Sequence, residues 1–493
     1  MSQSQALYSV AQVRAFDAHA IKVQGVPGYT LMQRAAEAAL HALRSRWPTA
    51  MRIAIVCGGG NNGGDGYVLG RYARAAGLEV SLYATVDTAK LQGDARRAAD
   101  DFRAGGGQPQ PFVPAALGSA EVLVDALLGT GARAPLAPEM LAAIAAMNRA
   151  GVPILALDLP SGLDADRGVP LGDAVRADTT ITFVAPKCGL YIGAGPEYAG
   201  RVLCDSLEVT PPGDAGSQPV LERIDESEIA RALPRRNRNA HKGDFGRVLI
   251  IAGGPGMAGA ARLAGEACLR VGAGLVTIAT APENVAAIVG GRPELICFGA
   301  RDPGDLEHAL RAATVIGVGP GFGTGPWSRA LFDAALAAGK SLVIDADALN
   351  LLAASDIRPP PGAVLTPHPG EAARLLGTSA AAVQADRPAA LRQLIDKTAA
   401  VVVLKGAGTL VGAPQRIGAL CTRGNPGMAA PGMGDVLTGA IAGILAQCGD
   451  PLQAARAGVI AHALAGDDLA RQGGGRGMLA LELAEGLTRW VNP

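Results

Sequence analysis

The sequence has 493 residues, 49% of them hydrophobic, with 67 glycines and equal numbers of basic (44) and acidic (44) side chains. This length suggests two or three domains with large buried cores, and the zero net charge argues against a general nucleic-acid or membrane surface. The first twenty residues lack the layout of a secretory signal, no apolar run is long enough to span a bilayer, and the seven scattered cysteines form no C-x-x-C pair. We therefore expect a cytoplasmic protein with no nucleic-acid or membrane partner.

In the first half of the chain, apolar strand-like runs alternate with Ala-rich helical segments. A helix is expected at 30–46, before the first strand, and another at 135–150. Such alternation predicts a mostly parallel sheet covered on both faces by helices. The predicted strands lie in 52–58, 78–84, 121–129, 152–160, 179–186 and 201–209.

A change of composition separates the two halves. Residues 209–220 are rich in Pro, Gly and Ser, as a linker is, and the alternation restarts after a charged segment. We predict one α/β domain at 1–212, a linker at 213–224 and a second α/β domain at 225–493. The second half has strand candidates in 247–254, 275–280, 314–321, 341–349, 362–371 and 400–412, followed by helical stretches from 434 to 490.

The first glycine loop, "GGGNNGGDG", supports two interpretations. Gly58, Gly60 and Gly63 match G-x-G-x-x-G and Asp87 lies about 20 residues further on, which is the dinucleotide fingerprint of a dehydrogenase. However, the stretch Asn61 to Asp65 adds side-chain oxygens and an anion where a pyrophosphate usually meets bare backbone. No catalytic His or Tyr constellation for a dehydrogenase is evident either.

More oxygen-bearing side chains follow neighbouring strands of the same half. Asp125 lies at the end of one predicted strand, and Asp158 and Ser161 at the end of another. Because parallel strands end at one edge of a sheet, Asn62, Asp125 and Ser161 are expected to meet there. Hard oxygen ligands favour an alkali or alkaline-earth cation. For Asp158 the alternative is a turn stabilised by its own side chain.

In the second half, "PGMGD" opens a helix that runs to about residue 447. A glycine-rich turn at a helix N-terminus presents free N–H groups to an anion. Beside such a phosphate site, Asp435 is suited to accept a proton from an attacking hydroxyl. The alternative is that Asp435 only caps the helix.

Three other segments carry weaker signals. Lys405 and the turn that follows it could contact a phosphate or form an ordinary hairpin, and His368, held between two prolines, could hold a substrate or cap a helix. Asp345 and Asp347 could orient a magnesium ion or cap a helix. No Lys-Ser/Thr pair of a Walker A motif follows any glycine loop.

In combination, "GVGPG", "TPHPGE", "LKGAGT" and "GNPGMAAPGMGDVLTG" resemble the ADP/ATP-dependent NAD(P)H-hydrate dehydratase family of the ribokinase-like superfamily, over about 225–493. The resemblance implies a ribokinase-like fold, a magnesium ion, and Asp435 as the base that starts phosphorylation of the hydrated ring, from which phosphate then leaves. Bacterial members resemble one another in using ADP, which yields AMP and phosphate. It also implies substrate contacts at Ala260, Gly321, His368 and Asp435, and nucleotide contacts at Lys405, Gly406, Ala407, Gly408, Thr409 and Gly434.

Over about residues 10–210, "GGGNNGGDGYVLGR", "DALLGTG" and "LDLPSGLDAD" resemble the NAD(P)H-hydrate epimerase family, which has a Rossmann-like three-layer fold. This resemblance implies a potassium ion on Asn62, Asp125 and Ser161. It also makes Asp158 the residue for proton transfer or for stabilising the ring during inversion, with Lys187 as a helper or a solvated loop residue. The implied substrate contacts are Asn61, Asn62, Gly63, Gly64, Asp65, Gly129, Thr130, Gly131, Ala132, Arg133, Ala134, Pro135 and Asp158.

Together the two resemblances predict a bifunctional metabolite-repair enzyme. It epimerises the R and S forms of hydrated NADH or NADPH and dehydrates the S form at the expense of ADP. The alternative is a ribokinase-like vitamin or sugar kinase with an N-terminal ligand-binding module. The Ala- and Gly-rich helices favour a homo-oligomer, a tetramer or larger.

Overall fold

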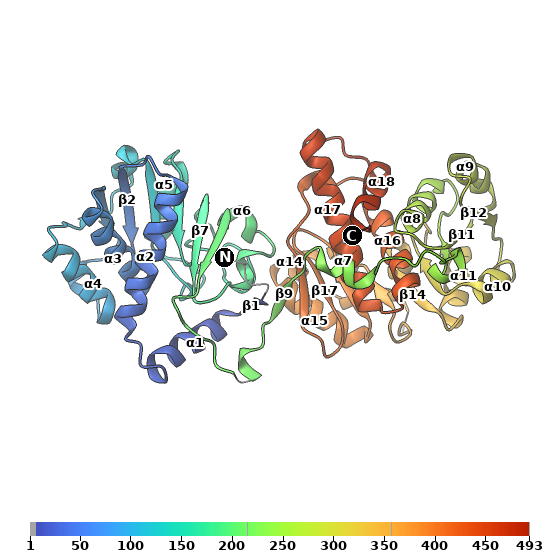
Figure 1. Cartoon of the computed structure of the whole chain (residues 1–493), viewed down its shortest axis with the longest axis horizontal. Helices are drawn as coiled ribbons and strands as arrows, with labels where there is room; N and C mark the ends of the chain where they lie inside the picture. Colours follow the sequence, from blue (N-terminus) through green and yellow to red (C-terminus); the bar gives the residue numbers. More distant parts are fainter. Residues whose placement is uncertain (1–5, 214, 356, 493) are drawn as a thin grey trace. The chain divides into compact units, whose positions relative to one another are not determined.

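The computed structural model describes residues 6–213, 215–355 and 357–492. The described chain forms two compact units, of which the first ends at Leu221 and the second begins at Glu222. The outermost ends of the predicted domains (1–5 and 493), residue 356 of the second and residue 214 of the predicted linker lie outside the described residues. Each unit has a sheet with helices packed on it (Figure 1), so the predicted two-domain α/β architecture is confirmed.

The first unit contains a seven-stranded sheet in the order β4-β3-β2-β5-β6-β7-β8. All neighbouring strands are parallel, with Ile55, for example, opposite Leu82 on one side and Val124 on the other. The six long strands fall inside the six predicted segments. The strands of this unit are β1 (Ala6–Leu7), β2 (Arg52–Cys57), β3 (Glu79–Ala84), β4 (Gln110–Pro111), β5 (Val122–Ala126), β6 (Ile154–Leu157), β7 (Thr179–Phe183) and β8 (Arg201–Asp205).

Both faces of this sheet are covered because its central strands are apolar on both sides. Ile53, Ile55 and Cys57 of β2 pack into a cluster with α2 and α3, whereas Ala54 and Val56 pack into another with α5. This is the three-layer arrangement predicted from continuous apolar strands. The helices are α1 (Val10–Lys22), α2 (Gly28–Arg46), α3 (Asn61–Ala75), α4 (Gly93–Ala104), α5 (Pro138–Arg149) and α6 (Gly195–Ala199).

The strand order creates a crevice next to β2. From β2 the chain adds β3 and β4 on one side, then returns to add β5 to β8 on the other side. At such a switch point, the connections that follow two neighbouring strands diverge, and ligands bind outside the carboxyl ends of the strands. The "GGGNNGGDG" loop follows β2, and Asp125 lies in β5, so the topology places the predicted residues at this crevice.

The second unit has a larger, mixed sheet in the order β9-β18-β17-β16-β15-β14-β13-β10-β11-β12. Strands β10 to β16 are parallel, whereas β16, β17 and β18 form antiparallel pairs. The strands are β9 (Leu221–Arg223), β10 (Arg247–Ile251), β11 (Leu275–Thr280), β12 (Ile296–Gly299), β13 (Val315–Val318), β14 (Ser341–Ile344), β15 (Val364–Leu365), β16 (Val401–Leu404), β17 (Thr409–Gly412) and β18 (Gly418–Cys421).

One large cluster of buried side chains joins this sheet to α8, α16, α17 and α18, and includes Val248 and Ile250 of β10. Helices α10 and α11 pack against β10 and β13. The helices are α7 (Ser227–Ala232), α8 (Ala258–Arg270), α9 (Val285–Gly291), α10 (Pro303–Ala312), α11 (Pro326–Ala337), α12 (Ala346–Ala353), α13 (Pro369–Leu376), α14 (Ala380–Ala385), α15 (Arg387–Thr398), α16 (Met433–Cys448), α17 (Pro451–Gly473) and α18 (Ala480–Trp490).

Sequence analysis did not predict β1, β4, β9, β12 and β18. All five strands are short, with two to four residues each. The seven cysteines are all free thiols, four of them buried. Within the described residues, no helix combines the length and apolar character needed to cross a membrane.

Candidate active sites

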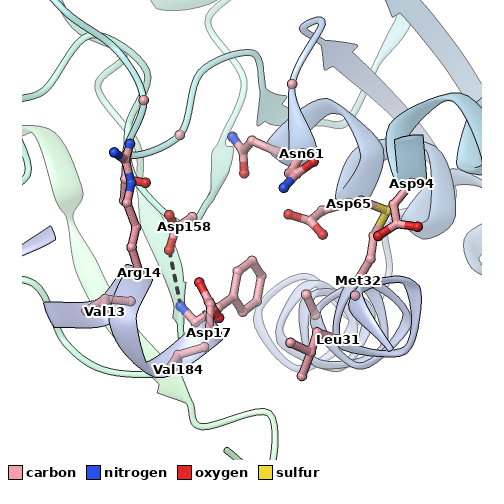
Figure 2. Close-up of a pocket in the computed structure, with 18 of the residues that line it drawn as sticks. Val13, Arg14, Asp17, Leu31, Met32, Asn61, Asp65, Asp94, Asp158 and Val184 are labelled. Atoms are coloured by element: carbon pink, nitrogen blue, oxygen red, sulfur yellow. Dashed lines mark hydrogen bonds between the residues drawn. The ribbon is translucent and has the colours of Figure 1, made fainter. Parts of the chain in front are cut away.

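A cavity of about 550 Å³ lies at the crevice of the first unit (Figure 2). Its walls come from the ends of β2, β5 and β6 and from helices α1, α2 and α3. Eight of the predicted substrate residues line this cavity: Asn61, Asn62, Asp65, Gly129, Thr130, Gly131, Ala132 and Asp158. The remaining predicted substrate residues, Gly63, Gly64 and Arg133 to Pro135, do not line it.

The three residues predicted to bind a cation join one hydrogen-bond network, and of the three only Asn62 lines the cavity. The Ser161 amide donates to Asp125 Oδ2 at 2.7 Å, and the Ser161 hydroxyl donates to Asp125 Oδ1 at 2.6 Å. The backbone N–H of Leu128 donates to the Ser161 hydroxyl at 2.7 Å, and Asn62 Nδ2 donates to the Leu128 carbonyl at 3.0 Å. One hydrogen-bonded cluster therefore links the ends of three secondary-structure elements.

The buried carbonyl oxygen of the Asn62 side chain, Oδ1, has no hydrogen-bond partner in the structure. Burying an acceptor without a hydrogen-bond partner costs free energy, so a ligand bound to this atom would stabilise the site. In the same hydrogen-bonded cluster, burial raises the pKa of Asp125 to about 6, although the hydrogen bonds from Ser161 oppose this effect. An oxygen-rich pocket with an unpaired acceptor and a destabilised carboxylate matches the requirements of a hard cation.

The Asp158 side chain forms a buried ion pair with Lys187. Lys187 is 1% exposed, and its ammonium group bonds to Asp158 Oδ1, to Thr182 Oγ1 at 2.9 Å and to the Phe183 carbonyl at 2.8 Å. Figure 2 shows the bond at Asp158. Asp158 has φ +63°, a conformation that non-glycine residues seldom adopt and that is often found at functional sites. The interpretation of Lys187 as a solvated loop residue is therefore wrong.

The structure gives two of the three fingerprint glycines, Gly58 and Gly63, a packing role, whereas a Cβ at Gly60 would have nothing within 4 Å. A Cβ at Gly58 would lie 1.9 Å from the Leu127 carbonyl oxygen, and one at Gly63 would lie 2.0 Å from the Gly58 carbonyl oxygen. The Asp87 side chain caps the short turn η1 (Thr88–Lys90) and is not among the residues that line the cavity. Close backbone packing thus accounts for Gly58 and Gly63 of the fingerprint match. Asp87, the acid that the fingerprint would assign to the ribose, does not line the cavity.

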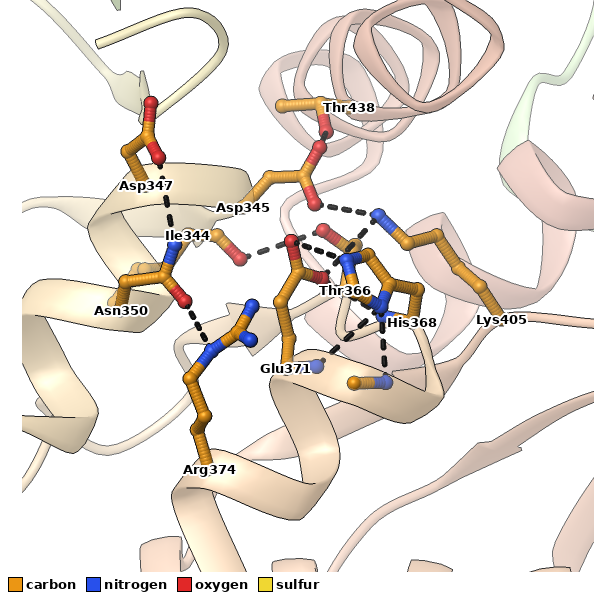
Figure 3. Close-up of polar contacts among 11 residues, drawn as sticks. Ile344, Asp345, Asp347, Asn350, Thr366, His368, Glu371, Arg374, Lys405 and Thr438 are labelled. Atoms are coloured by element: carbon orange, nitrogen blue, oxygen red, sulfur yellow. Dashed lines mark hydrogen bonds and ion pairs between the residues drawn. The ribbon is translucent and has the colours of Figure 1, made fainter. Parts of the chain in front are cut away.

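In the second unit, a buried lysine–aspartate pair lies at the carboxyl ends of β14 and β16 (Figure 3). Lys405 Nζ lies 2.7 Å from Asp345 Oδ1, and the Thr438 hydroxyl donates to Asp345 Oδ2 at 2.6 Å. Burial alone would raise the pKa of Asp345, but the ammonium of Lys405 and the hydroxyl of Thr438 hold it below its usual value. For Lys405, burial is outweighed by the carboxylates of Asp345 and Glu371, which raise its pKa. The pair therefore stays charged.

Asp435 lies in the first turn of α16, beside this pair. The N-cap of α16 is Gly432, with φ +85° and no side-chain cap bond, so the interpretation of Asp435 as an N-cap residue is wrong. Burial raises the pKa of Asp435 to about 7, with Asp345 adding to the shift and Lys405 opposing it. A carboxyl group that titrates near neutral pH, beside the free N–H groups of a helix N-terminus, is suited to proton transfer at an anion site.

His368 caps α13, which is one of the two roles considered from sequence, and it lies in the loop that follows β15. Its Nδ1 accepts from the N–H groups of Gly370 and Glu371 at 3.0 and 3.3 Å, and its Nε2 lies 3.2 Å from Glu371 Oε1. The ring is half exposed, so it remains accessible to a ligand. Glu371, which is 5% exposed and 3.8 Å from Lys405 Nζ, connects the cap to the buried pair.

The structure also brings together the other predicted residues of the second unit. A Cβ at Gly321 would lie 2.8 Å from the Ala260 Cβ, and one at Gly434 would lie 3.4 Å from Lys405 Nζ. The segment from Lys405 to Thr409 is the turn of the β16–β17 hairpin. Its shape is fixed by Arg387, a buried residue that donates to the carbonyl oxygens of Leu404, Lys405 and Gly408 at 3.1–3.3 Å.

Sequence reasoning missed several residues of the two sites. Arg14 and Asp17 line the first cavity from α1. In the second unit, Thr438 bonds to Asp345 and Arg387 holds the turn of the β16–β17 hairpin. Helix α1 carries no glycine loop or strand-end signal, and Arg387 lies in an ordinary polar segment. Of these, only Thr438 had a signal, its position one turn after Asp435 in the same helix.

Comparison with known proteins covers both units. The model for the YjeF-related protein N-terminus matches residues 28–189, and the NAD(P)H-hydrate dehydratase model matches 248–489. The bifunctional NAD(P)H-hydrate repair enzyme of Coxiella burnetii is 45% identical over 99% of each chain, and that of Escherichia coli is 42% identical over 98% of this chain and 93% of its own.

Solved structures resemble the second unit. A ribokinase-like superfamily protein from Enterococcus faecalis matches with 29% identity and a TM-score of 0.52, covering 56% of this chain and 98% of its own. The ADP/ATP-dependent NAD(P)H-hydrate dehydratase of Bacillus subtilis, co-crystallised with ATP and Mg²⁺, matches with 30% identity and a TM-score of 0.50, covering 55% and 97%. The predicted ribokinase-like fold is thereby confirmed, and the chain belongs to the family of bifunctional NAD(P)H-hydrate repair enzymes.

Proposed function

We propose that this chain repairs hydrated NADH and NADPH in two steps. The first unit interconverts the R and S epimers of the hydrate, and the second dehydrates the S epimer while ADP is converted to AMP and phosphate. The observation that carries this proposal is the 45% identity to a bifunctional repair enzyme along 99% of both chains. The two separate strand-end sites, one in each unit, fit two different reactions.

In the second unit, Asp435 acts as the base. Its pKa of about 7 lets it take the proton of the ring hydroxyl near neutral pH while that oxygen attacks the terminal phosphoryl group. The N–H groups at the start of α16, next to Gly434, and the ammonium of Lys405 stabilise the transferring phosphoryl group. Phosphate is a better leaving group than hydroxide, so its departure restores the reduced ring.

The proposed ligand contacts follow the same strand ends. The nucleotide binds at Gly434 and at the turn Lys405, Gly406, Ala407, Gly408, Thr409, and the hydrate contacts Ala260, Gly321, His368 and Asp435. Magnesium is supported by its presence with ATP in the Bacillus subtilis relative. Because Asp345 already bonds Lys405 and Thr438, we expect the phosphates to supply most of the ligands of this ion.

In the first unit, the hydrate binds in the cavity next to a potassium ion. The unpaired Asn62 Oδ1, Asp125 and Ser161 would hold this ion, whose charge would help to orient an electron-rich substrate. The Asp158 carboxylate, fixed by Lys187, is placed to stabilise positive charge that develops on the ring during inversion. The remaining contacts assigned to the hydrate are the loop Asn61 to Asp65 and the segment Gly129 to Pro135.

The test is to incubate the protein with hydrated NADH, ADP and Mg²⁺. The absorption band of the reduced nicotinamide should return, with one AMP and one phosphate released per ring, and both epimers should be consumed. A variant with Asp435→Asn should leave the S epimer untouched but still convert R to S. A stable phosphorylated product without recovery of absorbance would instead support a ribokinase-like kinase. Replacing ADP by ATP in the same assay establishes which nucleotide is preferred.

A further inference from the structure

Helix α1 forms one wall of the cavity in the first unit. Val13, Asp17 and Ile21 line the cavity at spacings of four residues, so they share one face of the helix, and Arg14 lines it as well (Figure 2). The matched family model begins at residue 28. Asp17 therefore belongs to the site by geometry while it lies outside the matched segment.

The cavity contains more carboxyl groups than buried cations. Its lining includes four carboxyl groups, those of Asp17, Asp65, Asp94 and Asp158. It includes two cationic side chains, of which Lys187 is buried and Arg14 is exposed. Lys187 is engaged with Asp158, Thr182 and Phe183. Within the part of the chain that the structure describes, neither Asp17 nor Asp65 has a hydrogen-bond or ion-pair partner.

The unpaired carboxyl groups hold their protons more tightly than usual. Burial raises the pKa of Asp17 to about 6, with Lys187 opposing the shift and Asp158 adding to it. Burial also raises the pKa of Asp65 well above its ordinary value, and the charges of Asp158 and Asp17 add to that shift. Both carboxyl groups therefore take up a proton more readily than an ordinary aspartate does, which suits them to exchange protons with a ligand in the cavity.

Epimerisation by loss and readdition of water uses such a pair. The inverted carbon carries a hydroxyl group and is bonded to the ring nitrogen. When the nitrogen lone pair forms a C=N bond, the C–O bond breaks and the hydroxyl, having taken one proton, leaves as water. A new water then adds to the opposite face and gives up one proton. The first half of the reaction thus takes up one proton and releases one water, and the second half takes up one water and releases one proton. The reaction needs an acid at one face and a base at the other.

We propose that Asp17 is a catalytic residue of the epimerase site, and that Asp17 and Asp65 transfer protons at the two faces of the hydrated ring. Asp17 approaches from α1 and Asp65 from α3, on different sides of the cavity (Figure 2). The group that acts as the acid in conversion of R to S acts as the base in conversion of S to R, because the reaction runs in both directions. Asp158, already paired with Lys187, stabilises the cationic ring between the two transfers. This assignment rests on the proposed epimerase function.

The experiment uses the full chain, the R epimer of hydrated NADH and water enriched in ¹⁸O. Asp17→Asn should lower kcat for conversion of R to S by at least about 100-fold with little change in KM, and Asp17→Glu should restore part of it. The wild type should place ¹⁸O on the inverted carbon, and its pH profile should contain a limb near 6 that Asp17→Asn lacks. Glu37→Gln, an exposed site on α2, is the matched control and should behave as wild type.

An unchanged thermal transition of the first unit in each variant shows that this unit is folded, because dehydration takes place in the other unit. If Asp17→Asn keeps its kcat and its pH limb while the wild type epimerises, the assignment of Asp17 is wrong. Retention of the original oxygen during inversion would also overturn it, because no water would then leave. If the wild type itself does not interconvert the epimers, the proposed epimerase function fails, and the assignment of Asp17 fails with it.

Discussion

The replacement of Asp435 by Asn should abolish dehydration and at the same time stabilise the second unit at alkaline pH. Burial raises the pKa of this carboxyl group from 3.8 to about 7, so folding favours its protonated form. Its contribution to stability is complete below pH 3.8 and is lost as the pH rises through 7. The shift of about 3 units corresponds to ~4 kcal/mol at pH 8, since each unit is worth ~1.4 kcal/mol. Asparagine, which stays neutral, avoids this loss.

The advantage of the Asn variant should depend on pH in a calculable way. At pH 5.5 the folded carboxyl group is still protonated, and only the ionisation of the unfolded chain counts, so the advantage falls to ~2 kcal/mol. For a domain of this size, ~4 kcal/mol corresponds to a rise of roughly 10 °C in Tm. Calorimetry on the full chain can follow this, because the transition of the second unit is the one that ADP and Mg²⁺ shift upward.

Two further measurements complete the test. Dehydration by the wild type should rise with pH around 7, as Asp435 ionises and becomes a base. Asp396→Asn, which removes an exposed carboxyl group of α15, serves as the control and should change neither activity nor Tm. The reasoning is refuted if Asp435→Asn lowers Tm at pH 8, or raises it equally at pH 5.5 and pH 8.

Three other predictions concern ligand binding. Removing potassium should lower the Tm of the first unit in the wild type but not in Asn62→Ala, because the unpaired Oδ1 is then gone; an equal loss in both would contradict the site. Gly434→Ala, whose Cβ has room 3.4 Å from Lys405 Nζ, should keep its Tm but weaken ADP binding about tenfold, ~1.4 kcal/mol, in titration calorimetry; unchanged affinity would place the nucleotide elsewhere. Arg387→Met removes the charged donor of three carbonyl oxygens and should cost about 3 kcal/mol of stability and raise the KM for ADP, whereas an unchanged KM would show that Arg387 does not shape the nucleotide turn.

The strands and the strand-end residues could be predicted because their signals are local. A buried parallel strand is a continuous apolar run, and the residue that follows it lies at the carboxyl edge of the sheet wherever the strand is placed. Asp125 and Ser161 were found in this way before their 2.6 Å hydrogen bond was seen. The glycine loops were found for the same reason, since close backbone approach leaves no alternative to glycine at Gly58.

The parts of the sites that were missed depend on packing between distant segments. Asp17 shares the cavity with residues such as Asp158 and Lys187, which follow more than a hundred positions later, and no local pattern encodes that proximity. Arg387 likewise lies 17 residues or more before the carbonyl groups it holds. The buried state of Lys187 was also invisible, because a lone lysine in a loop is usually solvated.

The two sites share an electrostatic arrangement although they lie on sheets of different topology. In each, a lysine in the segment that follows a parallel strand pairs with one aspartate, Lys187 with Asp158 and Lys405 with Asp345. The lysine satisfies one carboxylate and leaves another in the same site without a partner, so burial raises the pKa of the latter toward neutral pH, as at Asp17 and Asp435. Such a group can exchange protons with a bound hydroxyl, which both inversion and phosphorylation of the hydrate require. The pairing is therefore as necessary to the chemistry as the unpaired acid, because without the lysine both carboxyl groups would compete for one proton.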